Sequence, residues 1–160
     1  MDRYLSLYGT DFYAWTQDQA ARLRAAGAGR PAPGIDFEHL AEEIEDMGRG
    51  RLRALESALA RIIEHLLKLD YSPASDPRRL WRASVRVHRG HARDELEDSP
   101  SLIHRVRLDR AWRQAVLLAE EGLAAHGEAT VALPADCPYT LDEILDDGFL
   151  PVYRQGQTDA

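Results

Sequence analysis

Apolar residues recur every three or four positions along most of the chain, which is the pattern of amphipathic helices. One apolar stripe follows Asp36 and consists of Phe37, Leu40, Ile44 and Met47. A longer stripe consists of Leu52, Leu55, Leu59, Ile62, Ile63, Leu66 and Leu67. Gly48 and Gly50 lie between the two stripes, so the pattern allows either a bend in one helix or a break into two.

Capping signals mark the remaining helices. Asp11 is a good N-cap for a helix that ends near Gly27. Asp76-Pro77 and Ser99-Pro100 each place a capping residue before a proline, which favours the first helical position. We therefore expect a fourth helix that ends near Asp98 and a fifth that starts after Ser99, with apolar faces formed by Trp81, Val85, His88, Ala92 and Leu96, and by Leu108, Trp112, Ala115, Val116, Ala119 and Leu123.

Two segments differ from these helices. Residues 26–34 contain three glycines and two prolines and predict a flexible connection. Residues 130–160 predict an extended C-terminal tail with one short helix, because Thr140 and Glu143 have the spacing of a capping box. The predicted fold is all-α: a bundle of about four main helices plus a short C-terminal helix, in a single domain over residues 1–160.

Several short stretches, taken in order, resemble the bacterial family called domain of unknown function 29. They are residues 11–15 (DFYAW), 40–48 (LAEEIEDMG), 65–68 (HLLK), 81 (W), 99–102 (SPSL) and 137–139 (CPY). The resemblance runs nearly from end to end. It implies an all-helical fold, and it brings no activity, ligand or site residue with it.

Composition narrows the class of protein. Hydrophobic residues make up 44% and charged residues 29%, as in globular proteins. No apolar run reaches the roughly 18 to 20 residues that cross a bilayer, and the first residues lack the features of a signal peptide. The single cysteine, Cys137, favours a reducing compartment, and we expect the cytoplasm. The net charge of -7 argues against a general nucleic-acid binder.

The helix after Asp36 carries many acidic residues. Glu42, Glu45 and Asp46 lie away from its apolar stripe and predict a solvated face that pairs with arginines. Glu43 lies at the edge of the stripe beside Leu40 and Met47, where it would be half-buried. That position makes Glu43 a candidate general base or metal ligand.

Histidines form the second candidate site. His65 borders the apolar face of its helix, His88 lies near the middle of the next face, and His91 and Glu95 follow at helical spacing. Imidazoles and a carboxylate at this spacing could bind zinc or iron, although the sequence has no HExxH or CxxC motif, and we predict no resident cofactor. A second hypothesis places Glu43, His65 and His88 in one polar cluster, with Glu43 and His65 as candidate catalytic residues.

Arginines form the third candidate site. Arg82, Arg86, Arg89 and Arg93 recur at steps of four, three and four, and predict an exposed stripe. Such a stripe could bind phosphates. It could equally pair with the acidic helix of the same or a neighbouring molecule.

These observations favour a non-enzymatic cytoplasmic interaction or accessory protein with segregated acidic and basic faces, which binds a protein partner or itself. Two alternatives stay open. One is a metal-dependent enzyme with a histidine and carboxylate site between helices. The other is a nucleic-acid binder that uses the arginine stripe. No membrane partner is expected.

Overall fold

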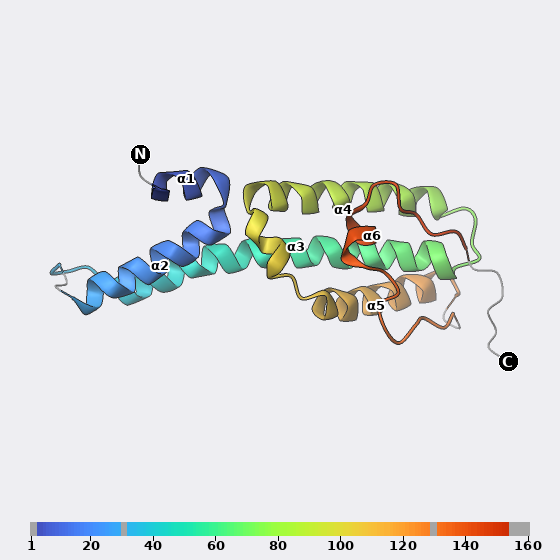
Figure 1. The fold of residues 1–160 in the computed structure, drawn as a ribbon. Coiled ribbons are helices and arrows are strands. Elements are labelled where there is room, and N and C mark those ends of the chain that lie inside the picture. The colour runs from blue at the N-terminus through green and yellow to red at the C-terminus, as the bar shows by residue number, and fades with distance from the viewer. Residues whose placement is uncertain (1–2, 30–31, 129–130, 154–160) are drawn as a thin grey trace. The chain divides into compact units, whose positions relative to one another are not determined.

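The computed structural model describes residues 3–29, 32–128 and 131–153, and these residues are mostly helical. The helices are α1 (Arg3–Thr10), α2 (Phe12–Ala28), α3 (Phe37–Tyr71), α4 (Arg78–Asp98), the 3₁₀ helix η1 (Pro100–His104), α5 (Leu108–Ala125) and α6 (Leu141–Leu145) (Figure 1). No strand occurs in these ranges. The all-α prediction, with four long helices and a short C-terminal one, is confirmed.

The chain forms two compact units. Unit 1 comprises residues 1–55 and 93–106, and unit 2 comprises residues 56–92 and 107–160. Helices α3 and α4 therefore each contribute a segment to both units. The expectation of one domain over residues 1–160 stays a prediction. Parts of the predicted connection and tail, residues 30–31, 129–130 and 154–160, lie outside the described residues.

Helix α3 continues without a break through Gly48 and Gly50, which decides the question that the sequence left open. Gly48 is buried and packs against Thr16 of α2, so closely that a Cβ at position 48 would collide with the Thr16 hydroxyl. Thr16 is itself buried, and its hydroxyl donates to the Tyr13 carbonyl at 2.7 Å. The glycine therefore serves close contact between two helices, not a turn.

The apolar stripe predicted for the first part of α3 is only partly correct. Leu40 and Met47 are 46% and 54% exposed. The buried line in this part of the helix consists of Ala41, Gly48 and Leu55. The small residues Ala41 and Gly48 lie there because α2 packs close to α3, and the larger Leu40 and Met47 lie at the edge of the contact.

Unit 1 is held together at the start of α2 by capping bonds between distant segments. Asp11 is the N-cap, as predicted, and its carboxylate accepts from the Ala14 amide at 2.9 Å. The same carboxylate accepts from the Ser101 amide at 2.8 Å and the Ser101 hydroxyl at 2.9 Å. The Ser99 hydroxyl accepts from the Tyr13 amide at 3.0 Å. Residues near 100 thus complete the N-terminus of α2.

The predicted start of the fifth helix after Ser99 is wrong. Ser99 and Pro100 begin only the short helix η1, and the Ser99 side chain makes no capping bond to it. Arg107 has an extended backbone (φ -104°, ψ 93°), which separates η1 from α5. The Arg107 amide donates to the buried Glu56 carboxylate at 3.3 Å. By contrast, α4 begins directly after Pro77, close to the predicted position.

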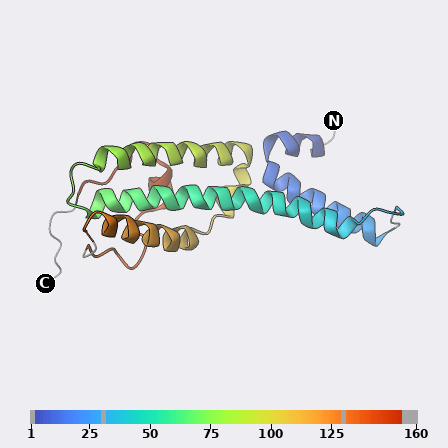
Figure 2. The same cartoon turned by 180° about the vertical axis from the view of Figure 1, so that it is seen from behind.

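The core of unit 2 is built on the second part of α3. This part of α3 lies between α4 and α5 in both views (Figures 1 and 2). Its fully buried side chains are Leu59, Ile62, Ile63, Leu66, Leu67 and Leu69. The other helices of unit 2 also contribute buried residues, among them Trp81, Val85, Ala115, Ala119, Leu123 and Ile144.

Arg89 attaches the C-terminal tail to unit 2. It is only 3% exposed, and its guanidinium donates to the carbonyls of Ile144 (2.8 Å), Glu143 (3.1 Å) and Phe149 (2.9 Å). The prediction that Arg89 lies on an exposed stripe is wrong. The last carbonyls of a helix lack partners within it, and the fork of arginine donors supplies them. The predicted capping box at the start of α6 is confirmed.

Candidate interaction surfaces and a histidine cluster

The first part of α3 presents an acidic stripe, which we define as Leu40, Glu42, Glu43, Asp46 and Met47. Leu40 and Met47 are seven residues apart, two helical turns, so both project from one side of the helix. Glu43 is exposed beside them, and Glu42 and Asp46 are exposed farther round the helix. Across the described ranges, neither Glu42 nor Glu43 forms an ion pair. The expectation of a half-buried Glu43 is wrong, because the larger apolar residues beside it are themselves exposed.

Glu45, by contrast, is already bound within unit 1. Arg24 of α2 grips it with two hydrogen bonds, at 2.5 and 3.1 Å, and also bonds Glu38 at 2.9 Å. The hydrogen bond from Arg24 lowers the pKa of Glu45. Asp46 pairs with Arg49 one turn along. The predicted pairing of this acidic helix with arginines therefore occurs for Glu45 and Asp46, and Glu45 faces α2.

Helix α4 presents a basic stripe in unit 2, which we define as Arg79, Leu80, Arg82, Arg86 and Val87. Leu80 and Val87 are also seven residues apart, and they are 72% and 55% exposed. All three arginines are exposed, and none forms an ion pair with any residue in the described ranges. Of the four predicted arginines, Arg82 and Arg86 belong to this surface. Arg93 is exposed within unit 1.

A hollow of about 550 Å³ lies next to the basic stripe. Leu80 lines one side of it, and the others are formed by the turn before α4 and the end of α5, with Ala74, Ser75, Asp76, Pro77, His126 and Glu128. The hollow thus extends the exposed apolar surface of Leu80 into a depression that a side chain could enter.

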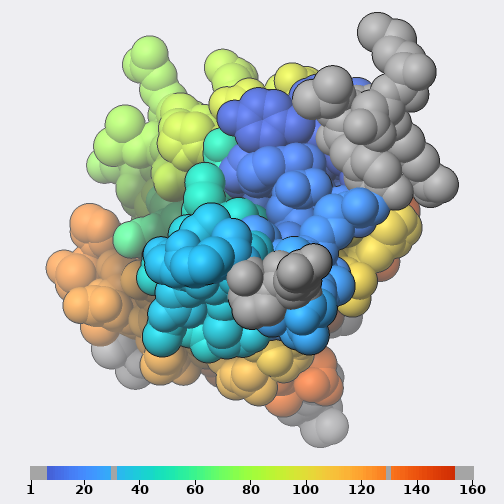
Figure 3. Space-filling view, turned by 90° about the vertical axis from the view of Figure 1, so that its left-hand side faces the viewer, coloured from blue at the N-terminus to red at the C-terminus, as the bar shows by residue number. Residues whose placement is uncertain are grey.

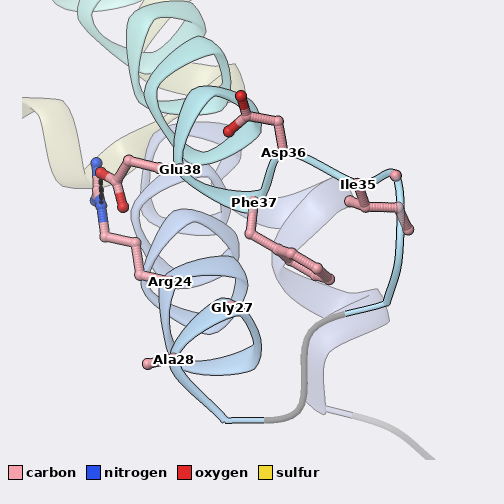
Figure 4. Close-up of a pocket in the computed structure, with 8 residues that line it drawn as sticks. Arg24, Gly27, Ala28, Ile35, Asp36, Phe37 and Glu38 are labelled. Atoms are coloured by element: carbon pink, nitrogen blue, oxygen red, sulfur yellow. Dashed lines mark hydrogen bonds and ion pairs between the residues drawn. The ribbon is translucent and has the colours of Figure 1, made fainter.

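Unit 1 has a second hollow, of about 710 Å³, where the chain turns from α2 into α3. Figure 4 shows Phe37 and Ile35 beside it, with the Arg24–Glu38 ion pair at the rim. Phe37 packs on Gly27, where an added Cβ would lie 2.8 Å from the Phe37 Cβ. Figure 3 views unit 1 from this end, where the start of α3 lies beside the end of α2. The lining combines apolar and charged groups and includes no histidine or cysteine.

Asp36, which also lines this hollow, is held by His39. The His39 amide donates to the Asp36 carboxylate at 3.1 Å, so Asp36 caps α3 as predicted. The His39 ring nitrogen lies 2.5 Å from the other carboxylate oxygen. This hydrogen bond lowers the pKa of Asp36 and raises that of His39. The capping role accounts for this carboxylate.

Three histidines come together in unit 2. The rings of His65 and His88 are stacked at 6.4 Å between centroids, and His91 meets His88 edge-on at 5.5 Å. His65 Nδ1 lies 2.8 Å from the Arg61 carbonyl, which can only accept, so this nitrogen donates. Burial lowers the pKa of His65 and of His88, and the neighbouring His65 and His91 lower that of His88 further.

The acidic members of the predicted histidine sites belong to unit 1. Glu95 is in unit 1 and pairs with Arg51 at 3.4 Å. Glu43 is exposed on the acidic stripe. Within residues 3–29, 32–128 and 131–153, no three histidine, cysteine, aspartate or glutamate side chains are placed to hold one metal ion. The three histidine rings therefore meet within unit 2, and both candidate carboxylates belong to unit 1.

Comparison with known proteins identifies a family and a solved structure with a similar fold. The family model described as domain of unknown function DUF29 matches residues 7–150. The chain belongs to the DUF29 family. It is also similar to the crystal structure of an alpha-helical protein of unknown function from Rhodospirillum rubrum ATCC 11170, with 33% sequence identity and a TM-score of 0.77. That similarity covers 89% of this chain and 90% of the other. No curated protein matches.

This DUF29 protein also buries charged groups that the periodicity did not reveal. Glu64 accepts from Lys68 at 2.6 Å and from Arg61 at 3.0 Å, and Gly122 of α5 leaves room for the Lys68 side chain. Burial raises the pKa of Glu64, but these partners outweigh it and hold the pKa below its usual value. The i, i+4 spacing of Glu64 and Lys68 inside an apolar run was the available signal.

A membrane-spanning role finds no support in the helices of this DUF29 protein. None of the helices in the described residues combines the length and the apolar character needed to cross a bilayer. The two stripes, the two hollows and the histidine cluster are candidate surfaces in the described residues.

Proposed function

We propose that this DUF29 protein is a non-enzymatic cytoplasmic interaction or accessory protein, which binds protein helices through the acidic stripe of α3 and the basic stripe of α4. One observation carries the proposal. Each stripe exposes two large apolar side chains at a seven-residue spacing beside charged side chains. Asp46 pairs with Arg49 of its own helix, and the other charges of the two stripes have no ion pair in the described residues. That spacing is the one by which helices recognise other helices.

The environments of the candidate carboxylates favour this function over a metal-dependent enzyme. The acidic candidates of the enzyme hypothesis, Glu43 and Glu95, are an exposed side chain and a partner of Arg51. The carboxylate nearest His65 is Glu64, which already accepts from Lys68 and Arg61. A base or ligand needs a lone pair that is aimed at the substrate or metal, whereas Glu64 and Glu95 accept from basic side chains.

The composition of the basic stripe favours a protein partner over nucleic acid. Its arginines flank Leu80 and Val87, whereas proteins that bind single strands place aromatic rings between basic residues to stack the bases. The net charge of -7 also opposes association with a polyanion. Binding to a helix that carries acids and apolar residues satisfies both parts of the stripe.

The proposal is tested by site-specific photocrosslinking in the native host. A photoreactive residue is placed at Glu43 or Arg86 within the stripes, and at the exposed positions Arg113 and Glu120 of α5 as matched controls. We expect discrete protein adducts from the stripe positions and none from the controls. Equal labelling at all four positions would overturn the proposal. Stoichiometric metal in the purified protein, with a lower melting temperature after chelation, would favour the enzyme instead.

A further inference from the structure

We infer that the partner of each stripe is the other stripe of a second copy, so that α3 of one molecule packs antiparallel against α4 of another. This inference rests on the proposed function and names the partner. The sequence ranges involved are the part of α3 in unit 1 and the part of α4 in unit 2. Every copy carries one stripe of each kind.

The apolar residues of the two stripes match in spacing. Leu40 and Met47 are separated by seven residues, and so are Leu80 and Val87. At about 1.5 Å rise per residue, each pair spans about 10 Å along its helix. In an antiparallel pairing Leu40 meets Val87, and Met47 meets Leu80. The hollow beside Leu80 then lies next to Met47, whose flexible thioether side chain suits an irregular cavity.

The charges select the antiparallel direction. At about 100° per residue, Glu43 and Asp46 flank the apolar pair of α3 on the same rotational side as Arg79 and Arg86 flank that of α4. Two helices packed face to face bring such same-side flanks together only when they run in opposite directions. Glu43 is then about half a turn from the level of Arg86, and Asp46 about half a turn from that of Arg79.

The same charges oppose pairing of like stripes. Two acidic stripes would bring carboxylates together, and two basic stripes would bring guanidinium groups together. The favoured contact therefore joins unlike surfaces. Such heterologous contacts either close, as in a dimer with two of them, or continue into a longer assembly.

The proposed contact between the two stripes is small, so a high protein concentration is needed for it to form. It covers two turns of each helix, which bury less than the roughly 1,200 to 2,000 Å² of a stable interface. Association is therefore expected to be reversible and to depend on protein concentration and on salt.

The decisive experiment is sedimentation analysis of charge-reversed full-length chains over a range of concentrations. We expect the wild-type chain to associate. Reversal of the acidic stripe (Glu43→Arg with Asp46→Arg) or of the basic stripe (Arg79→Glu with Arg86→Glu) should weaken association at least tenfold. A mixture of the two variants should regain it, because the reversed α3 of one faces the reversed α4 of the other. Reversal of Arg113 and Glu120 on α5 is the matched control and should change nothing.

Cysteine pairs test the direction of packing. In chains with Cys137→Ser, mixing Leu40→Cys with Val87→Cys should give a disulfide-linked dimer under mild oxidation. Mixing Leu40→Cys with Leu80→Cys should give at least tenfold less, and the reverse ratio would overturn the antiparallel arrangement.

The two proposals fail in different ways. A wild-type chain that stays monomeric at all concentrations, or mixed variants that do not regain association, overturns the self-association. If discrete adducts with a different protein still form at Glu43 and Arg86, the interaction function stands. If those adducts are also absent, both proposals are overturned.

Discussion

The two parts of helix α3 are buried in different ways. In unit 1 the buried line is made of small residues, Ala41 and Gly48, and the larger Leu40 and Met47 are exposed. In unit 2 most positions are buried, including the charged Glu64 and Lys68. The difference follows from the neighbours. The first part packs mainly against α2, and the second lies between α4 and α5. An apolar stripe therefore becomes core only where enough elements cover it.

The largest expected effect compares leucines from the two parts. Leu66→Ala removes a fully buried side chain and should lower the free energy of unfolding by about 2 to 5 kcal/mol. Leu40→Ala removes an exposed one and should change it by less than about 0.5 kcal/mol. Urea denaturation of dilute, monomeric protein measures both. Equal losses would show that the two parts of α3 are covered alike.

The buried ion pair sharpens the comparison. Lys68→Met leaves the Glu64 carboxylate buried with Arg61 as its remaining partner, and we expect a loss of about 3 kcal/mol at neutral pH. The lowered pKa of Glu64 means that its ion pairs stabilise the fold above its usual pKa and are lost as the pH falls. The gap between variant and wild type should narrow toward pH 4. A gap that is independent of pH would mean that packing, not charge, sets the loss.

A pair of glycines tests the close contact in unit 1. Gly48→Ala places a Cβ against the Thr16 hydroxyl and should cost about 1 to 3 kcal/mol. Gly50→Ala is the matched control, since a Cβ there meets nothing within 4 Å. It should stabilise α3 by about 0.5 to 1 kcal/mol. Thermal melts measure both variants: the melting temperature should fall for Gly48→Ala and rise for Gly50→Ala.

The smallest effect concerns pH and the histidine cluster. The lowered pKa of His65 and of His88 means that the unfolded chain binds more protons than the folded one just below pH 6.5. Stability should therefore fall as the pH drops below about 6.5, the ordinary pKa of histidine. His65→Phe should flatten this dependence, and His104→Phe, at an exposed position outside the cluster, should not. Denaturation series between pH 5 and 8 measure the slope.

Local signals predicted much of the fold. Asp11 and the Thr140–Glu143 capping box act through neighbouring amides, so their roles are readable from the sequence. Helix α1 was missed, because residues 3–10 offer only a short apolar pattern of about two turns. The continuity of α3 could not be decided either. A glycine at position 48 reads the same at a break and at a close helix contact, and only Thr16 distinguishes them.

The candidate site was less predictable, since it depends on what covers each face. Helical periodicity brought the three histidines to one side, and their rings do lie close together. It also predicted that Arg89 is exposed like Arg82 and Arg86. Arg89 is buried instead, because it binds carbonyls that lie more than 50 residues away in the sequence. Exposure of Leu40 and Leu80 likewise required knowing which faces stay uncovered.

The anchor made by Arg89 has a consequence for how the tail can change. All three of its acceptors are backbone carbonyls, which every amino acid possesses. The side chains at the anchored positions can therefore be exchanged without removing an acceptor, as long as the backbone keeps its course. Arg89, the donor, cannot be exchanged in this way, because lysine offers one compact ammonium group in place of the planar guanidinium fork. Tolerance to substitution is thus concentrated on one side of the contact, and engineered changes to the tail are best made with Arg89 left in place.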